Sequence, residues 1–549
     1  MTIPFPTPPV PVLAVDGLSL SYSQADGWRR VVEDVSFTVG AGEVVALVGE
    51  SGSGKTTTAQ AVIGLLPDNG RRDSGSIKLN GTDISQWSGK RLDAIRGKAI
   101  SLVPQDPGSS LNPVLTIGHQ VGEILRLHGE RNRQARKARV LELLTRVGLS
   151  EPALRYDQYP HELSGGMKQR ALIAIAVALR PALIIADEPT SALDVTVQRR
   201  ILDLIDELRA EFGTSVLLVT HDLGVAADRA DRIIVLKNGR IQEQGITKTV
   251  LTRPSSDYTK QLLSDAPSLA PVSLRTLPKA TTPAIVVSHL VQDFQVAGKA
   301  FRAVDDVSFS VAAGTTHALV GESGSGKTTT ARNVVGFQRP TSGSVSVEGT
   351  EISALRGESL RLFRRNVQFV YQNPFASLDP RQSVAEIIGE PLRNFEKVGK
   401  AELSDRVRAI LGKVGLPEDT LSRTARALSG GQRQRVAIAR ALILEPRVLV
   451  LDEAVSALDV TVQAQILRLL DGLQQSLGLT YLFVTHDLAV VRQLAHTVTV
   501  MQAGRVVESG TVAAVFTNPQ AQYTRDLIAA IPGRRNAVPN RLEFAGAAE

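Results

Sequence analysis

Glycines, a lysine and a threonine recur at one fixed spacing in two places along the chain. GESGSGKT runs from Gly49 to Thr56 and again from Gly321 to Thr328. Glycines let the backbone curl so that its N–H groups surround a polyphosphate, the lysine reaches the terminal phosphates, and the threonine hydroxyl suits Mg²⁺. Each copy follows an apolar run and precedes a helical pattern, so both are predicted to bind phosphates. The predicted contacts are Gly49, Ser51, Gly52, Ser53, Gly54, Lys55, Thr56, Thr57, Gly321, Ser323, Gly324, Ser325, Gly326, Lys327, Thr328 and Thr329.

Paired acids end two other apolar runs. LIIADE ends in Asp187 and Glu188, and VLVLDE ends in Asp452 and Glu453. The first acid of each pair can hold Mg²⁺, and the second can orient or deprotonate a water that attacks a phosphoryl group in line. Alone, such a pair is as often a solvated strand end. Together with a phosphate loop in each copy, the acids favour nucleotide hydrolysis.

The whole chain reads as a duplication. LSGG begins at Leu163 and Leu428, and VTHDL begins at Val219 and Val484, so two copies of a unit of about 265 residues fill nearly all of the sequence. We predict a first domain over 1–265, a proline-rich linker over 266–284, a second domain over 285–532 and a flexible tail over 533–549. Carboxy-terminal extensions are expected at about 246–267 and 511–532, and the proline-rich first dozen residues are expected to be unstructured.

Short β-branched runs alternate with longer helical patterns inside each copy. Val44–Val48, Leu183–Ala186 and Val216–Thr220 are predicted buried strands, and Thr57–Leu66 is the helix predicted after the first phosphate loop. Strand–loop–helix alternation indicates an α/β fold with a mostly parallel sheet and with its chemistry at the strand ends.

Composition excludes several classes of protein. The chain has 549 residues, 62 Lys and Arg against 55 Asp and Glu (net charge +7), and no cysteine. Without cysteine there is no disulfide framework, thiolate zinc site, cysteine nucleophile or iron–sulfur cluster held by this chain. The longest apolar run, Ala171–Leu179, is far too short to cross a bilayer, and the amino terminus lacks a signal-peptide pattern. A soluble protein is expected, and the basic run Arg126–Arg139 is interpreted as a solvated helix face rather than a nucleic-acid patch.

Three further elements carry a family resemblance. LSGG, followed by a basic helix in both copies, resembles the signature motif of ABC-transporter ATPases; Gln105 and Gln372, each after an apolar strand, resemble the Q-loop glutamine; and His221 and His486 resemble the switch histidine. Tyr22 and Phe294 stand at equivalent positions, where the family stacks an aromatic ring on adenine, although a lone aromatic there is more often part of a core. The resemblance implies two tandem P-loop nucleotide-binding domains, each with a RecA-like α/β core and a helical subdomain.

In that family two ATP molecules lie in a head-to-tail sandwich, where each site takes its signature from the other copy. The resemblance therefore implies ATP and Mg²⁺, with Glu188, His221, Glu453 and His486 as catalytic residues. Mg²⁺ would be held by Thr56, Gln105, Asp187, Thr328, Gln372 and Asp452, and the signature contacts would be Ser164, Gly165, Gly166, Ser429, Gly430, Gly431 and Gln432. No catalytic position is lost in either set, so both sites are predicted to hydrolyse ATP. Met167 in place of Gln432, and Ala454 and Val455 in place of Pro-Thr, are departures that could make them unequal.

Finer details resemble the oligopeptide, dipeptide and nickel importers. These are the segments after both Q-loop glutamines, YPHELSGGMKQR from Tyr159, and the extensions Arg253–Pro267 and Asn518–Pro532, although the second signature lacks the Tyr-Pro-His lead-in. The resemblance implies a motor at the cytoplasmic face of the inner membrane. Its partners would be two integral-membrane permeases, docked in grooves beside the Q-loops, and an extracytoplasmic substrate-binding protein, with no nucleic acid. The alternatives are a tandem ATPase acting on ribosomes or nucleic acid, which a long charged linker and NHLD would favour, and an exporter motor.

Overall fold

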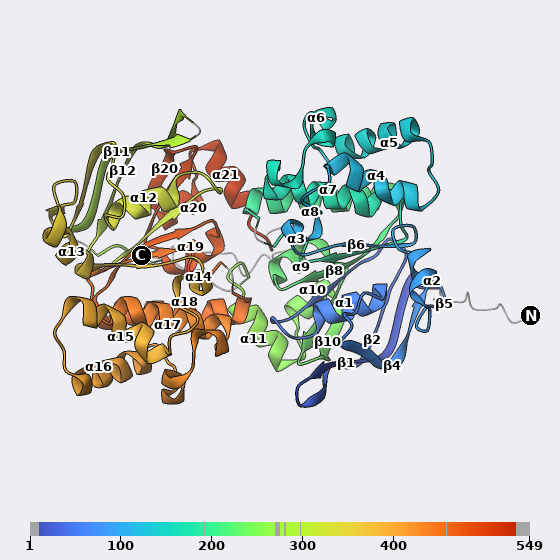
Figure 1. Cartoon of the computed structure of the whole chain (residues 1–549), viewed down its shortest axis with the longest axis horizontal. Helices are drawn as coiled ribbons and strands as arrows, with labels where there is room; N and C mark the ends of the chain where they lie inside the picture. Colours follow the sequence, from blue (N-terminus) through green and yellow to red (C-terminus); the bar gives the residue numbers. More distant parts are fainter. Residues whose placement is uncertain are drawn as a thin grey trace, which may run out of the picture. The chain divides into compact units, whose positions relative to one another are not determined.

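The chain folds as two compact units, which divide in the linker after Leu269. A computed structural model describes residues 10–191, 193–269, 275–278, 282–296, 298–456 and 458–533. Figure 1 colours the first unit blue to green and the second yellow to red. Each unit is treated by itself below. The predicted unstructured amino terminus and tail lie mostly outside the described residues.

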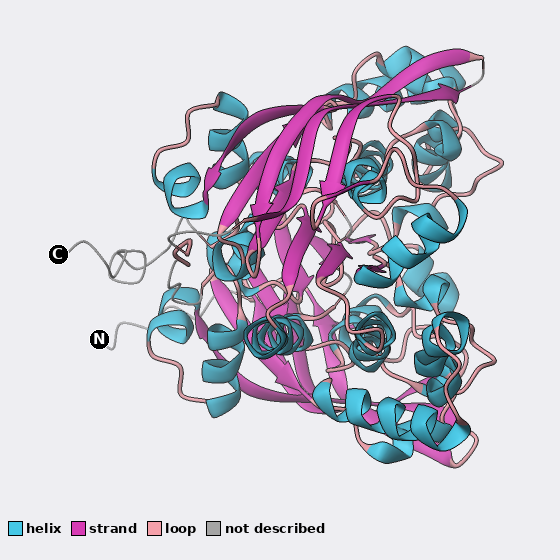
Figure 2. Ribbon diagram, turned by 90° about the vertical axis from the view of Figure 1, so that its left-hand side faces the viewer, coloured by secondary structure: helices cyan, strands magenta, loops and turns pink. Residues whose placement is uncertain are grey.

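A six-stranded sheet forms the core of the first unit, in the order β10-β9-β3-β8-β7-β6. Its strands are β3 (Val44–Val48), β6 (Ile100–Val103), β7 (Leu183–Asp187), β8 (Ser215–Thr220), β9 (Arg232–Lys237) and β10 (Arg240–Ile246). All neighbours are parallel except β10 against β9. Because β3, β7 and β8 are buried throughout, they read as continuous apolar runs rather than alternating ones. Figure 2 shows helices flanking the strands.

The helix after the phosphate loop, α1 (Lys55–Ile63), begins and ends earlier than the predicted 57–66. Gly54 (φ 100°) precedes it, and Gly64 (φ 70°) ends it in the left-handed region, where glycine has no Cβ penalty. A smaller antiparallel sheet, in the order β2-β1-β4-β5, packs beside α1 through a shared apolar core. Its strands are β1 (Leu13–Gln24), β2 (Gly27–Val39), β4 (Gly70–Leu79) and β5 (Thr82–Asp83).

Helices dominate the middle and the end of the first unit. The helical part contains α2 (Gly89–Asp93), α3 (Pro107–Ser110), α4 (Ile117–Leu127), α5 (Arg133–Arg146), α6 (Pro152–Asp157) and α7 (Gly165–Val177). The later helices are α8 (Val195–Phe212), α9 (Leu223–Arg229) and, in the extension, α10 (Thr247–Thr252) and α11 (Asp257–Asp265). The basic run at 126–139 covers the end of α4 and the start of α5, and α5 buries only Val140, Leu143 and Leu144.

The second unit repeats this plan. Its core sheet has the order β16-β17-β18-β13-β19-β20 and its antiparallel sheet the order β12-β11-β14-β15. The strands are β11 (Pro283–Val296), β12 (Lys299–Ala312), β13 (Thr316–Val320), β14 (Ser342–Val347), β15 (Thr350–Glu351), β16 (Val367–Val370), β17 (Val448–Asp452), β18 (Thr480–Thr485), β19 (Thr497–Gln502) and β20 (Arg505–Thr511). The helices are α12 (Lys327–Val334), α13 (Gly357–Asn366), α14 (Pro374–Ser377), α15 (Val384–Phe395), α16 (Lys400–Lys413), α17 (Gly430–Leu442), α18 (Val460–Leu477), α19 (Leu488–Leu494), α20 (Val512–Thr517) and α21 (Gln522–Ala529).

The linker is anchored to the second unit where the structure describes it. Arg275 donates to the Asp471 carboxylate at 2.7 Å and to the Gln493 carbonyl at 3.3 Å.

Among the described residues, no helix combines the length and the apolar character that crossing a bilayer requires. The predicted alternation of strands and helices is thus realised twice in one chain.

Candidate ATP site

The first phosphate loop connects β3 to α1 at the carboxyl edge of the core sheet. Lys55 is 5% exposed, and its Nζ donates to the carbonyl oxygens of Gly49 and Glu50, each at 2.8 Å. A Cβ on Gly49 would lie 2.2 Å from the Leu236 carbonyl oxygen, so this glycine is required by the close approach of β9 as well as by the curl of the loop. The lysine is thereby held at the centre of its own loop, where phosphates are predicted to bind.

Asp187, at the end of β7, faces the start of α1. Thr56 Oγ1 donates to Asp187 Oδ1 at 3.1 Å, so the predicted hydroxyl and carboxylate are brought together. Burial raises the pKa of Asp187 to about 6, a shift that the Thr56 hydrogen bond opposes and the charge of Glu188 reinforces. A bound cation would favour the ionised carboxylate. Two converging oxygens of these types fit Mg²⁺, which prefers hard oxygen ligands.

Glu188 occupies a strained position one residue further along. Its φ is +44°, in the left-handed region that a non-glycine residue rarely adopts, and its N–H donates to the Val219 carbonyl on β8 at 2.9 Å. This backbone turns the carboxylate toward two partners: Gln105 Nε2 donates to Oε2 at 2.9 Å, and His221 Nδ1 lies 3.1 Å from Oε1. Gln105, predicted as a metal ligand, therefore contacts the second acid of the pair here.

The glutamate and the histidine shift one another's protonation. Burial alone would raise the pKa of Glu188, but the hydrogen bond and charge of His221 outweigh it and lower that pKa. Burial alone would lower the pKa of His221, and the contact with Glu188 reverses this and raises it. The carboxylate is thereby kept ionised, which is the form a general base requires.

The second unit contains the same arrangement. Lys327 Nζ donates to the carbonyls of Gly321 (2.8 Å) and Glu322 (2.7 Å), and Thr328 donates to Asp452 at 3.0 Å. Glu453 has a φ of +47°, accepts from Gln372 Nε2 at 2.7 Å and lies 3.3 Å from His486 Nδ1. Burial raises the pKa of Asp452 and lowers that of Lys327.

The two aromatic residues predicted to stack on adenine lie at matching places on β1 and β11. The Tyr22 hydroxyl is 3.5 Å from Thr57 Oγ1, which places this side chain beside the first turn of α1. Phe294 pairs in register with Phe301 on β12. Stacking on adenine stays a prediction for both residues.

The signature motifs open α7 and α17, but their caps differ. Ser164 Oγ accepts from Met167 N at 3.4 Å, and Ser429 Oγ accepts from Gln432 N at 3.3 Å. Only Gln432 returns a bond, because its Oε1 accepts from Ser429 N at 3.0 Å and completes a capping box. With Met167 in place of glutamine, the first signature helix lacks the second of these two capping hydrogen bonds. Ala454 and Val455, the other departures, are buried in the apolar core.

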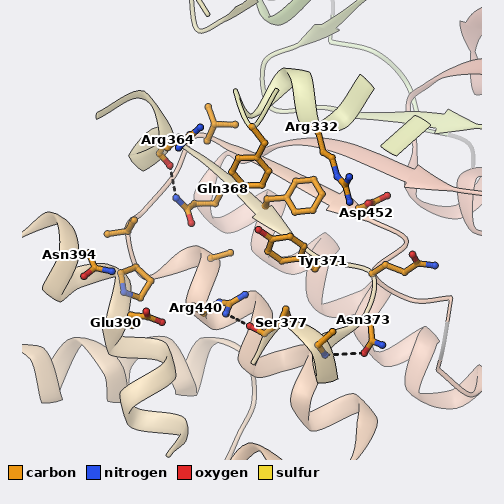
Figure 3. Close-up of a pocket in the computed structure, with 18 of the residues that line it drawn as sticks. Arg332, Arg364, Gln368, Tyr371, Asn373, Ser377, Glu390, Asn394, Arg440 and Asp452 are labelled. Carbon is orange, nitrogen blue, oxygen red and sulfur yellow. Dashed lines mark hydrogen bonds between the residues drawn. The ribbon is translucent and has the colours of Figure 1, made fainter. Parts of the chain in front are cut away.

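A groove of about 660 Å³ lies beside Gln372 in the second unit. Aromatic rings form one wall: Phe337 and Tyr371 stack at 6.4 Å, and Phe369 meets Tyr371 edge-on at 4.8 Å. Figure 3 shows charged side chains around these rings; they are Arg332, Arg364, Glu390, Arg440 and Asp452. The sequence predicts a groove beside the Q-loop but gives no signal of its aromatic lining, since Phe337 and Phe369 come from separate parts of the chain with no motif in common.

Each unit has a phosphate loop, a threonine–aspartate pair and a half-buried glutamate that contacts a glutamine and a histidine. Two such units define a tandem P-loop ATPase. The family model described as "ABC transporter" matches residues 32–191 and 304–456, and one described as "Oligopeptide/dipeptide transporter, C-terminal region" matches 507–546. The chain belongs to the ABC transporter family. It is a transporter ATPase that binds and hydrolyses ATP.

Its relatives span nearly its whole length. It is 44% identical over 532 residues to "Peptidoglycan transport ATP-binding protein YejF" of Agrobacterium fabrum, covering 95% of this chain and 96% of that one. It is 40% identical over 558 residues to "Glutathione import ATP-binding protein GsiA" of Salmonella typhimurium, covering 95% and 89%. Among solved structures, cbiO1 from Clostridium perfringens is 30% identical, with a TM-score of 0.40 over 43% of this chain and 91% of that one.

Proposed function

We propose that this chain is the motor subunit of a peptide importer, in which one polypeptide supplies both ATP sites. The observation that carries the proposal is the oligopeptide/dipeptide carboxy-terminal region at 507–546, which follows a complete second ATPase domain. Relatives named for peptidoglycan, glutathione and oligopeptide transport cover both domains, which supports cargo of peptide type. A ribosomal or nucleic-acid role, like an exporter role, has no such support.

The catalytic work is assigned to side chains already placed in each unit. Glu188 and Glu453 are ionised acceptors positioned to take the proton of an attacking water, and the histidine beside each carboxylate orients it. Lys55 and Lys327 move from their own loop carbonyls to the β- and γ-phosphates of ATP. Thr56 with Asp187, and Thr328 with Asp452, would hold Mg²⁺, which when bound neutralises charge on the phosphates.

We further propose that the signature of each copy completes the ATP site of the other in a head-to-tail sandwich. The serine and the glycine N–H groups at the start of α7 and of α17 form a helix N-terminus suited to a phosphate. Closure on ATP and opening after hydrolysis would then drive the permeases. Two permeases, an extracytoplasmic binding protein and a peripheral place at the cytoplasmic face of the inner membrane follow from this role.

The groove beside Gln372 is proposed to receive a short helix of one permease. Its rings offer an apolar wall. Its three arginines outnumber its acids, of which Asp452 is already assigned to Mg²⁺, so the groove favours a helix that carries an acidic group. Phe337 is 42% exposed there. Phe337→Glu is expected to abolish capture of the permease while leaving ATP hydrolysis by the isolated chain unchanged. Leu477→Glu, at a side chain 42% exposed at the end of α18, is the matched control.

Affinity purification of the full chain from solubilised membranes tests the function directly. Two multi-spanning permeases and a binding protein, whose bound ligand is then identified by mass spectrometry, are the expected co-purifying partners. Enrichment of ribosomes or nucleic acid in their place would overturn the importer role. Retention of the permeases by Phe337→Glu would overturn only the docking site.

A further inference from the structure

Each carboxy-terminal extension places a tyrosine hydroxyl against a phosphate loop. Tyr258, on α11, accepts a hydrogen bond from the N–H of Glu50 at 3.3 Å. Tyr523, on α21, accepts from the N–H of Glu322 at 3.1 Å. Tyr258 is only 8% exposed. The extension is therefore in contact with the ATP machinery of its own unit in both copies.

The peptide unit that the tyrosine holds is also the one that holds the lysine. The N–H of Glu50 and the C=O of Gly49 belong to one planar amide, so fixing the direction of one fixes the other. Lys55 Nζ donates to that Gly49 oxygen at 2.8 Å. The second unit repeats the chain of contacts, since Lys327 Nζ donates to the Gly321 oxygen at 2.8 Å. A single rigid group thus links the tyrosine hydroxyl to the phosphate-binding lysine.

The loop amide needs this hydrogen bond because the residue before it is a glycine. Gly49 has a φ of +152° and no side chain to limit its rotation, so the amide after it depends on outside partners for its orientation. The Tyr258 hydroxyl bonds its N–H side and Lys55 its oxygen side. When the lysine turns toward phosphate, the tyrosine remains as the bond that keeps the amide in place.

A carboxylate on the core sheet holds the start of each extension helix through two hydrogen bonds. Glu243, on β10, accepts from the N–H groups of Ser255 (2.8 Å) and Ser256 (3.1 Å), just before α11. Burial alone would raise the pKa of Glu243, but these hydrogen bonds outweigh it and lower that pKa, so the acceptor stays ionised. Glu508, on β20, accepts from Gln520 (2.8 Å) and Ala521 (3.1 Å) in the same way.

Both units share the contact of the tyrosine hydroxyl with the loop amide, but not the cation beside the ring. Lys237 Nζ lies 4.3 Å from the centre of the Tyr258 ring, whereas Gln502 occupies the equivalent position on β19 and offers no cation. Burial raises the pKa of Tyr523 to about 12, so the phenol stays protonated. The ring surroundings differ between the copies while the bond to the loop amide is kept.

We propose that Tyr258 and Tyr523 are positioning residues for ATP binding, which hold the first amide of each phosphate loop and through it the loop lysine. The extensions thereby tune the affinity of each site for ATP. This inference rests on the ATPase activity and not on the identity of the cargo, so a failed membrane capture would leave it standing.

Tyr258→Phe, Tyr523→Phe and the double variant test the proposal in the full chain. Each keeps the ring and removes the acceptor. We expect the KM for ATP, and the Kd for ATP measured without Mg²⁺, to rise by about threefold to tenfold at the altered site, as suits the loss of one hydrogen bond, with kcat changed less. Glu243→Gln and Glu508→Gln should shift KM in the same direction, because they weaken the hydrogen bonds that hold each extension and do not contact the phosphate loop.

Tyr481→Phe is the matched control. Its buried hydroxyl donates to the Leu470 carbonyl at 2.9 Å, away from the phosphate loop, so the variant also loses one buried hydrogen bond. It should lower the Tm with the KM for ATP unchanged. A double variant with the KM and the ATP affinity of the unaltered chain, or one that changes only the Tm as Tyr481→Phe does, would overturn the proposal.

Discussion

Gln105 donates through Nε2 to Glu188 at 2.9 Å, and Gln372 makes the same contact with Glu453 at 2.7 Å. In each unit the glutamate is thus bonded by a side chain from the end of another strand, β6 or β16. The carboxylate cannot move without disturbing the Q-loop glutamine. We propose that in the second unit this contact links hydrolysis at the strand edge to the groove beside Gln372.

Replacing the two glutamates one at a time tests whether both sites hydrolyse ATP. Glu188→Gln and Glu453→Gln keep the shape of the side chain and remove the base, for which losses of about 10²–10⁴-fold are typical. We expect each single variant to show defective single-turnover hydrolysis, and the double variant to bind ATP without hydrolysing it. Glu207→Gln, at an exposed acid on α8, is the control. Full activity in either single variant would show that only one site works.

The incomplete cap on the first signature helix leads to a second prediction. Met167→Gln supplies the side chain that Gln432 provides in the other copy, and it should complete the capping box with Ser164. A gain of about 0.5–1 kcal/mol in the unfolding free energy of the first unit is expected in chemical denaturation. The reverse change, Gln432→Met, should destabilise the second unit by a similar amount. No change in either variant would show that the cap contributes nothing to stability.

The first glycine of the phosphate loop gives a third prediction. A Cβ at Gly49 would lie 2.2 Å from the Leu236 carbonyl oxygen, and one at Gly321 would lie 2.1 Å from that of Met501. Both collisions are with backbone, so Gly49→Ala and Gly321→Ala should displace the loop and abolish ATP binding at the altered site, as measured by calorimetry. Gly42→Ala meets no atom within 4 Å and is the steric control, although its φ of +68° adds some strain. Wild-type affinity in Gly49→Ala would contradict this account.

Local patterns predicted most of the site, and tertiary contacts account for what they missed. Val44–Val48 is β3 as predicted, because a short buried apolar run before a glycine loop is a local signal. The left-handed backbone of Glu188 and the contact between Tyr258 and Glu50 have no such signal, since each depends on elements that are far apart in the sequence. The recurrence of Tyr258 and Tyr523 at equivalent positions was visible in the sequence, but their partner was not.

The second unit is expected to lose stability in acid because of one buried histidine. His317, on β13, is fully buried and stacks on Phe309 at 4.9 Å; its Nδ1 contacts Thr497 Oγ1 at 2.8 Å, and its Nε2 has no hydrogen-bond partner among the described residues. Burial lowers the pKa of His317 to about 3. Because the unfolded chain takes up this proton below about pH 6.5 and the folded chain does not, stability is lost as the pH falls from 6.5 toward 3.

Between pH 7 and pH 5, His317 should therefore cost the second unit about 1–2 kcal/mol of unfolding free energy. Val45 stands at the equivalent position of the first unit, so His317→Val is the natural test. The chain's two tryptophans, Trp28 and Trp87, are both in the first unit, so their fluorescence follows that unit while far-ultraviolet circular dichroism follows both. Denaturation is followed by both signals at pH 7 and at pH 5. We expect His317→Val to reduce the acid-induced loss of unfolding free energy measured by circular dichroism, and to leave the loss measured by fluorescence unchanged. If His317→Val and the unaltered chain lose the same unfolding free energy in acid, this histidine is protonated as readily in the folded state as in the unfolded one.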